Sequence, residues 1–138
     1  MKTIKELLNK LNYKTIQGNL DKEVSAVVYD SRKISEGCLF ICIKGANFNG
    51  HDFAKEAANK SAACVVICED VDLPVDTDIT VIRVEDTRYA MAFISAAWFD
   101  YPAERLNVIG ITGTKGKTTT TYLVKSILEQ TGRKTGLI

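Results

Sequence analysis

The chain has 138 residues, with 18 Lys and Arg against 17 Asp and Glu and a net charge of +1 at pH 7. Hydrophobic residues make up 46% of it and charged residues 25%, which is typical of a globular protein and excludes a disordered or fibrous chain. No basic block and no apolar run of about 20 residues is present, so we expect no nucleic-acid partner and no membrane insertion. The first residues lack the apolar stretch of a signal peptide, which favours a cytoplasmic protein.

The first hundred residues alternate between short apolar runs and helical patterns. Thr3 and Glu6 have the spacing of a capping box and predict an amphipathic helix over residues 4–11. Asp86 can cap a longer helix of about four turns. The remaining elements are a helix at residues 52–59 and strands at residues 24–29, 38–43, 64–68 and 79–84. Strands that alternate with helices predict an α/β protein.

A linker is predicted at residues 101–105, because Pro102 lies just past the longer helix. A strand, a tight loop, a helix and the opening of another strand follow, at residues 106–111, 112–116, 117–130 and 134–138. In the predicted helix Leu123, Ile127 and Leu128 would face inward.

We therefore divide the chain into an N-terminal domain, residues 1–101, and the start of a second domain, residues 102–138. The second part holds the first β-loop-α unit of a nucleotide-binding domain, and a parallel sheet needs further strands to close. We expect the sequence to be part of a longer protein for this reason.

The four cysteines lie in two of the predicted strands, as Cys38 with Cys42 and Cys64 with Cys68. Residues four apart in one strand share a face but lie about 13 Å from each other, so one such pair cannot supply adjacent ligands of a zinc ion. We interpret all four as buried core thiols. A zinc site would require cysteines of different strands to converge.

The strongest chemical signal is the run Ile-Gly-Ile-Thr-Gly-Thr-Lys-Gly-Lys-Thr-Thr at residues 109–119. It follows a predicted strand and opens a predicted helix, which is the context of a phosphate-binding loop. The backbone N–H groups and the dipole of a helix N-terminus attract an anion, and Gly113 and Gly116 let the backbone wrap phosphates. Lys117 adds a positive charge for the outer phosphates, and the Thr118 hydroxyl can ligate Mg²⁺.

The loop is a variant of the G-x-x-x-x-G-K-[ST] pattern, because the first glycine of that pattern would fall on Ile111. A glycine-rich turn without function is the alternative interpretation. Lys115 is a second cation in the loop, which either attracts ATP or points to solvent.

The loop at residues 112–119 resembles the Thr-Gly-Thr-Asn-Gly-Lys-Thr-Thr signature of the Mur ligase family, with Lys115 in place of the usual Asn. These enzymes are ATP-dependent and add amino acids to peptidoglycan precursors. Two further runs resemble motifs of the tripeptide-synthetase branch (MurE type). Tyr-Asp-Ser-Arg with Glu-Gly-Cys-Leu-Phe at residues 29–32 and 36–40 resembles Asp-Ser-Arg…Pro-Gly-Asp-Leu-Phe, and residues 44–53 resemble a Gly…Asp-Gly-His…Phe loop with Asn49 in place of Asp.

This resemblance implies that the N-terminal domain binds the uridine diphosphate part of UDP-MurNAc-L-Ala-D-Glu. Ser31 would contact the uridine diphosphate end, with Tyr29 beside it. The uracil pocket would be lined by Gly45, Ala46, Asn47 and Phe48. The resemblance also implies a catalytic Lys117, a Mg²⁺ ligand in Thr118, and ATP contacts from Thr112, Gly113, Thr114, Lys115, Gly116, Lys117 and Thr118.

The implied reaction phosphorylates the terminal carboxylate of the UDP-MurNAc-dipeptide with ATP, after which an amine of the lysine or diaminopimelate class displaces phosphate. A monomer is expected. Three alternatives stay open: a D-Ala-D-Ala-adding ligase of the same family, a non-catalytic UDP-sugar-binding module, and an unrelated P-loop kinase or NTPase. From the residues alone, Asp30, Ser31 and Arg32 also fit a turn with an internal Asp–Arg pair. We assign no catalytic role to His51, the single histidine, which fits a loop or helix start.

Overall fold

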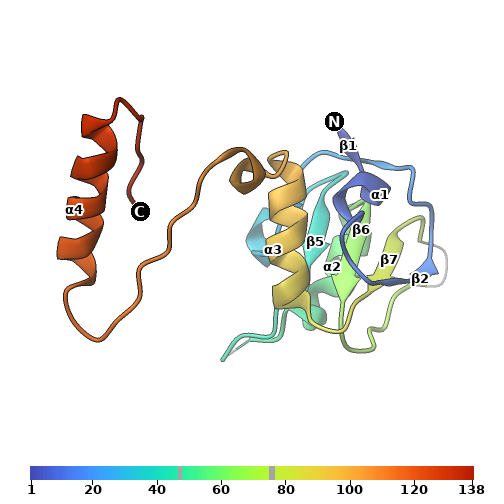
Figure 1. The fold of residues 1–138 in the computed structure, drawn as a ribbon. Helices are drawn as coiled ribbons and strands as arrows, with labels where there is room; N and C mark the ends of the chain where they lie inside the picture. The colour runs from blue at the N-terminus through green and yellow to red at the C-terminus, as the bar shows by residue number, and fades with distance from the viewer. Residues whose placement is uncertain (47, 75–76) are drawn as a thin grey trace. The chain divides into compact units, whose positions relative to one another are not determined.

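The computed structural model describes residues 1–46, 48–74 and 77–138. The chain divides into two compact units, Met1–Pro102 and Ala103–Ile138, which are described separately below. The first unit contains every strand and three α-helices of the described residues, and the second contains one long helix (Figure 1).

A five-stranded sheet with the order β2-β7-β6-β5-β4 organises the first unit. Four of its strands are parallel, namely β4 (Val27–Val28), β5 (Leu39–Ile41), β6 (Cys64–Ile67) and β7 (Thr80–Arg83). At one edge β2 (Lys14–Gln17) is antiparallel to β7. A second sheet of two strands pairs β1 (Lys2–Thr3) with β3 (Glu23–Val24). The predicted α/β fold class is therefore confirmed.

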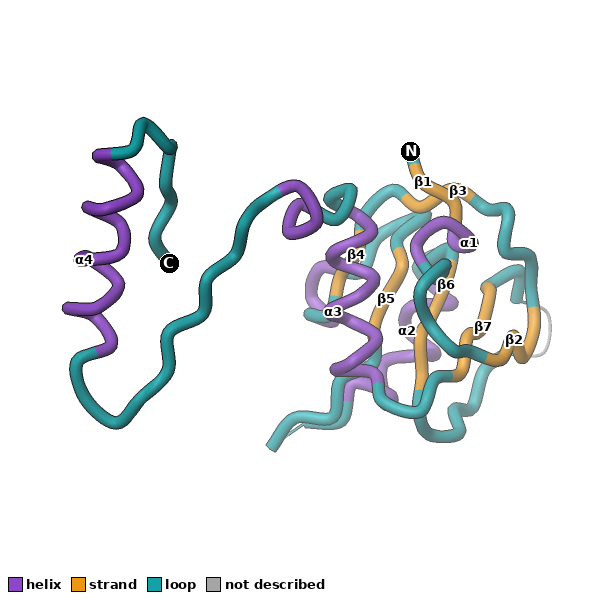
Figure 2. The backbone as a smooth tube through the Cα atoms, viewed as in Figure 1, coloured by secondary structure: helices purple, strands orange, loops and turns teal. Residues whose placement is uncertain are grey.

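Helices cover both faces of the large sheet. α1 (Ile4–Leu7) and α3 (Thr87–Trp98) lie on one face, and α2 (Ala54–Asn59) lies on the other (Figure 2). Short 3-10 helices span Ser31–Lys33, Gly50–Phe53 and Pro102–Arg105.

The alternation of side chains along the strands separates two hydrophobic cores. In β5, Leu39 and Ile41 are fully buried with α1 and α3, whereas Phe40 is fully buried on the side of α2. Because successive strand residues point to opposite faces, a continuous apolar run is what a sheet with both faces covered requires. This explains why the central strands were predictable as short hydrophobic runs.

The capping box predicted for the first helix is confirmed. The Thr3 hydroxyl accepts the Glu6 N–H at 3.3 Å, and the Glu6 carboxylate accepts the Thr3 N–H at 2.7 Å. The helix itself is shorter than predicted and ends after Leu7. Leu8 is nevertheless fully buried, so the apolar pattern beyond the helix reflects packing of the following turn.

The predicted cap of α3 is also confirmed. Asp86 accepts the N–H groups of Arg88 at 2.7 Å and of Tyr89 at 3.2 Å through the same carboxylate oxygen. The helix has 12 residues, about three turns rather than four. Ala90 and Ile94 are fully buried on its inner face, which packs on the sheet.

Replacement of Asp86 by Ala is expected to lower the free energy of unfolding by about 1 kcal/mol, because two first-turn donors lose their acceptor. Urea unfolding followed through Trp98, the single tryptophan, measures the change. Glu85→Ala is the matched control, since it removes a neighbouring charge without removing the cap. An equal loss in both variants would assign the effect to charge at the helix N-terminus instead of to the two hydrogen bonds.

Two features of the first unit differ from the predictions. The strand predicted at residues 24–29 is divided between the two sheets, because Ser25 leaves the ladder and donates its N–H to Gly37 O at 2.9 Å. β2 was not predicted. All four of its residues are exposed, so its sequence carries no buried run by which a strand is recognised.

The cysteine prediction is confirmed for three of the four residues and is wrong for Cys68, which is not in the core. Cys38, Cys42 and Cys64 are buried, Cys68 is half-buried, and all four thiols are free. Burial raises the pKa of the Cys42 thiol to about 12 and also raises the pKa values of Cys38 and Cys64. Among the described residues no group of three or more His, Cys, Asp or Glu side chains is placed to hold a metal ion.

In the second unit the predicted helix is confirmed as α4 (Lys117–Gln130). The strands predicted at residues 106–111 and 134–138 are wrong, since no strand occurs among the described residues of that unit. Leu123 and Ile127, predicted to face inward, are 60% and 63% exposed, and Leu128 is half-buried. A strand forms only where a neighbour completes its hydrogen bonds, and an apolar helix face is buried only where a sheet or helix covers it.

Candidate functional site

The loop before α4 leaves the first amides of that helix without internal partners. Gly116 is the N-cap residue with φ of 76°, in the left-handed region that glycine adopts without strain, and no side chain caps the helix. The Thr120 N–H donates to Gly116 O at 2.9 Å as the first bond of the helix. The N–H groups of residues 117–119, which come before Thr120 in the helix, are therefore available to an anion.

The Lys117 ammonium adds a positive charge at the same loop. Its Nζ donates to Gly113 O at 2.7 Å, so the side chain folds back over the loop from which it comes. The Thr121 hydroxyl donates to Lys117 O at 2.7 Å, whereas the Thr118 hydroxyl has no hydrogen-bond partner among the residues that the structure describes. Residues 112–120, Lys115 included, are exposed. Free amides, an ammonium and an uncommitted hydroxyl make this loop chemically suited to a phosphate chain with a divalent cation.

The proposed substrate residues of the first unit that the structure describes lie beyond the carboxyl ends of two neighbouring parallel strands. Tyr29 and Ser31 follow β4, and residues 44–49 follow β5, the neighbouring strand. The carboxyl ends of parallel strands are where open α/β sheets collect ligands. The loop after β5 projects from this edge in Figure 1.

The turn after β4 contains the internal pair that the sequence left as an alternative. Arg32 donates from Nε and Nη2 to the two carboxylate oxygens of Asp30 at 2.9 and 2.7 Å. The hydrogen bonds from Arg32 lower the pKa of Asp30 to about 2. Arg32 is thus committed to Asp30, while the half-buried Ser31 hydroxyl has no partner within the described parts of the chain.

The loop after β5 presents exposed residues on a fixed base. Lys44 and Asn49 form an isolated antiparallel bridge, and Gly45 N donates to Phe48 O at 2.8 Å. Gly45 and Ala46 are exposed, and Phe48 is 77% exposed. The predicted contact Asn47 lies outside the described residues.

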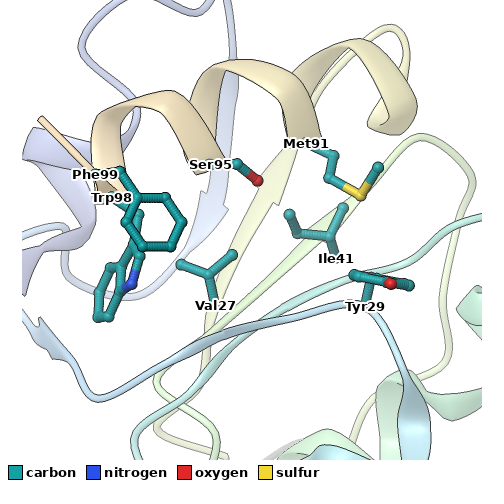
Figure 3. A pocket seen from close by; sticks show the side chains of 7 residues that line it. All are labelled: Val27, Tyr29, Ile41, Met91, Ser95, Trp98 and Phe99. Atoms are coloured by element: carbon teal, nitrogen blue, oxygen red, sulfur yellow. The ribbon is translucent and has the colours of Figure 1, made fainter. Parts of the chain in front are cut away.

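An apolar pocket of about 250 Å³ lies between α3 and strands β4 and β5. Figure 3 shows Met91, Ser95 and the two aromatic side chains at the end of α3 directed toward Val27, Ile41 and Tyr29. Of the proposed substrate residues that the structure describes, Tyr29 lines this pocket, whereas Ser31, Gly45, Ala46 and Phe48 do not.

His51 is buried at the base of the loop after β5, with 6% of its surface exposed. Its Nε2 accepts the Cys68 N–H at 3.0 Å, so the proton sits on Nδ1, which donates to Asn49 Oδ1 at 2.7 Å. Burial lowers the pKa of His51, which keeps the ring neutral near pH 7. The histidine is therefore a buried structural donor and acceptor at the start of the 3-10 helix.

The contacts between strand ends were not predicted. Lys44 and Glu69 form an ion pair at 2.8 Å, and Arg88 donates to Lys44 O at 2.8 Å. These residues are far apart in the sequence and no local spacing links them. The one available signal is that each follows the end of a neighbouring parallel strand.

Comparison with known proteins places these observations in a family. Residues 23–99, more than half of the chain, match the family described as "Mur ligase family, catalytic domain". The chain belongs to the Mur ligase family.

Among Mur ligases, the UDP-N-acetylmuramoyl-L-alanyl-D-glutamate–2,6-diaminopimelate ligase of Clostridium perfringens is 47% identical over 135 residues, covering 98% of this chain and 28% of that protein. The chain thus spans about 28% of the length of this curated relative. A solved UDP-N-acetylmuramoylalanyl-D-glutamyl-2,6-diaminopimelate–D-alanyl-D-alanyl ligase from Acinetobacter baumannii has a TM-score of 0.64 and 27% identity over 93% of this chain and 28% of that chain. A MurF ligase from Thermotoga maritima in complex with ADP has a TM-score of 0.53 and 27% identity, over 79% of this chain and 24% of that chain.

Membership of the Mur ligases excludes the alternative of an unrelated P-loop kinase or NTPase. No helix among the described residues has both the length and the apolar character needed to cross a membrane.

Proposed function

We propose that this chain is the substrate-docking and ATP-binding portion of a ligase that joins 2,6-diaminopimelate to UDP-MurNAc-L-Ala-D-Glu. The observation that carries the proposal is the 47% identity, over 98% of the chain, to a ligase named for that reaction. The phosphate-binding chemistry of the loop before α4 supports the ATP dependence. We assign the reaction to the cytoplasm, where ATP is supplied.

In this proposal the second unit binds the phosphates of ATP. An anion can bind the free amides at the start of α4 and the Lys117 ammonium directly, because no side chain caps this helix and none has to be displaced. Binding requires the ammonium to exchange its bond to Gly113 O for a phosphate oxygen, an exchange within reach of the same flexible side chain. Thr112, Thr114 and Lys115 flank the anion from the rest of the loop.

Thr118 would hold Mg²⁺ through its uncommitted hydroxyl. When bound, Mg²⁺ would supply positive charge against the negative charge that develops during phosphoryl transfer. The substrate carboxylate attacks the γ-phosphorus of ATP, which forms an acyl phosphate and releases ADP. The amine of diaminopimelate then attacks the acyl carbon, which forms the amide and releases phosphate and a proton. We assign the binding of diaminopimelate to the part of the ligase outside this chain, because the chain spans about 28% of the length of the curated relative.

The first unit holds the uridine end of the nucleotide sugar. The Ser31 hydroxyl, next to the Asp30–Arg32 pair, is available as a hydrogen-bond partner of the diphosphate or ribose. Tyr29 and Phe48 offer exposed aromatic surface at the same edge of the sheet. Gly45 and Ala46 complete the proposed uracil pocket, with Asn47 between them and Phe48.

A second candidate is the D-Ala-D-Ala-adding ligase, because a solved structure that resembles this chain over 93% of its length carries that name. The full-length enzyme separates the two candidates. With ATP and Mg²⁺, we expect phosphate release to require UDP-MurNAc-L-Ala-D-Glu together with diaminopimelate. Release that instead requires a UDP-MurNAc-tripeptide and D-Ala-D-Ala would favour the second candidate, and binding of nucleotide sugar without any turnover would favour a non-catalytic module.

Ser31→Ala in the full-length enzyme is expected to raise KM for the UDP-substrate about five-fold, the effect of one hydrogen bond worth about 1 kcal/mol. KM for ATP is expected to stay constant. Ser35→Ala is the control, since it removes an exposed hydroxyl four residues further along the same turn region. An unchanged KM in the Ser31 variant would remove this residue from the binding site.

A further inference from the structure

The loop at residues 44–49 is held at its base by a continuous chain of hydrogen bonds that no sequence motif revealed. Glu69 stands at the centre of it, beyond the end of β6. One of its carboxylate oxygens accepts from Lys44 Nζ at 2.8 Å, and the other accepts from Asn49 Nδ2 at 3.0 Å. Both arms of the loop are therefore fastened to the same carboxylate.

The chain of hydrogen bonds continues from Asn49 into the interior. Asn49 Oδ1 accepts from Nδ1 of the buried His51, whose Nε2 accepts the backbone N–H of Cys68. Cys68 immediately precedes Glu69, so the path returns to the end of β6. On its far side, the Lys44 carbonyl accepts from Arg88 of α3 at 2.8 Å. The loop after β5 is thus tied both to β6 and to α3.

The direction of every bond in this chain is fixed. The carboxylate of Glu69 can only accept, which orients the Asn49 amide with its nitrogen toward Glu69 and its oxygen toward His51. The backbone N–H of Cys68 can only donate, which leaves the His51 proton on Nδ1. An ordered chain with one hydrogen-bonding pattern is a rigid base for an exposed loop.

We propose that Asn49, His51 and Glu69 are positioning residues that set the conformation of residues 44–46 and 48 for binding the uridine end of the UDP-substrate. This inference rests on the proposed function of the loop. These three side chains act through the loop and not by touching the nucleotide. Residues 44–46 and 48 gain a defined geometry because the two arms of the loop share one carboxylate, and because one arm is bonded to the buried His51.

The test exploits the fixed direction of the Asn49–Glu69 bond in the full-length enzyme. Asn49→Asp replaces a donor by an acceptor and sets two carboxylates against each other, so KM for the UDP-substrate is expected to rise about ten-fold with kcat and KM for ATP nearly unchanged. Glu69→Gln offers a donor where Lys44 or Asn49 needs an acceptor, and a smaller rise in the same KM is expected.

The double variant Asn49→Asp with Glu69→Gln reverses the bond and restores it. The amide nitrogen of the introduced glutamine can donate to the new carboxylate, while its amide oxygen accepts from Lys44. KM is expected to return to within about two-fold of the wild-type value, a strongly non-additive result. Asn59→Asp, on the exposed end of α2, controls for the added charge.

The outcomes separate this inference from the proposed function. Wild-type turnover combined with an unchanged KM in the Asn49 variant overturns the inference alone. Parallel loss of kcat, UDP-substrate affinity and ATP affinity, or a double variant no better than the single ones, shows a general structural role and also overturns it. Absence of wild-type turnover and of UDP-substrate binding overturns the proposed function and this inference with it.

Discussion

Lys117→Ala in the full-length enzyme is expected to lower kcat by roughly a thousand-fold, the upper range for loss of one group that stabilises transition-state charge. The residue follows Gly116 at the start of α4, and its ammonium already lies over the loop through its bond to Gly113 O. Among the described residues of the second unit, no other Lys or Arg side chain donates a hydrogen bond to the backbone of this loop. Steady-state phosphate release measures kcat.

The same variant is expected to bind the UDP-substrate with unchanged affinity in a calorimeter, because that ligand is assigned to the first unit. Lys125→Ala is the matched control: it removes a cation from the same helix, where Lys125 lies 3.7 Å from Glu129 in an exposed pair. Its kcat should stay near the wild-type value. If Lys117→Ala weakened both ligands equally, the assignment of ATP and UDP-substrate to separate units would be wrong.

Gly50→Ala is expected to destabilise the first unit by about 3 kcal/mol, at the upper end of overpacking costs. A Cβ at this position would lie 2.5 Å from Ile43 N and 2.8 Å from Ile43 O, both rigid backbone atoms. The backbone can relieve this contact only by breaking the Gly50 N–H bond to Ile43 O, which closes the loop after β5. The midpoint of urea unfolding, followed through Trp98 fluorescence, is the measurement.

Gly136→Ala provides the control, because a Cβ at Gly136 would meet no atom within 4 Å. Its unfolding midpoint should match the wild type. A Gly50 variant as stable as the control would mean that the end of β5 and the base of the loop shift without any loss in the free energy of unfolding. In that case the loop would be more adaptable than its hydrogen bonds indicate.

Much of the first unit could be predicted because its elements carry local signals. Leu39 to Ile41 is a buried strand with both faces covered, and Asp86 caps α3 by accepting two amide N–H groups. Such features depend on a few adjacent residues, which a single sequence displays directly.

The second unit shows where local signals mislead. Residues 106–111 have the composition of a strand and Leu123 has the spacing of a core residue, yet neither has a partner among the described residues of its unit. Strand formation and helix burial depend on neighbours and not on composition alone. The phosphate-binding loop between them could still be recognised, because its function depends on one glycine-rich turn and one helix end.

The hydrogen-bond chain around Glu69 could not be predicted, since its members come from the ends of three elements. His51 was interpreted as a residue of a loop or helix start, which its position in the 3-10 helix Gly50–Phe53 confirms. Its burial and its bond to the backbone of Cys68 depend on the pairing of β5 with β6, which a residue pattern does not specify. The assignment of substrate contacts to Tyr29 and Ser31 stays a prediction.

The buried thiols make the first unit convenient for chemical labelling. The thiolate is the form of cysteine that attacks labelling reagents, and burial keeps Cys38, Cys42 and Cys64 protonated by raising their pKa values. A cysteine introduced at the exposed Ser35 would therefore react far faster than these three native residues, leaving half-buried Cys68 as the one native competitor to replace. A fluorophore at this position, four residues from Ser31, would then report nucleotide-sugar docking without removing a proposed contact or disturbing either hydrophobic core.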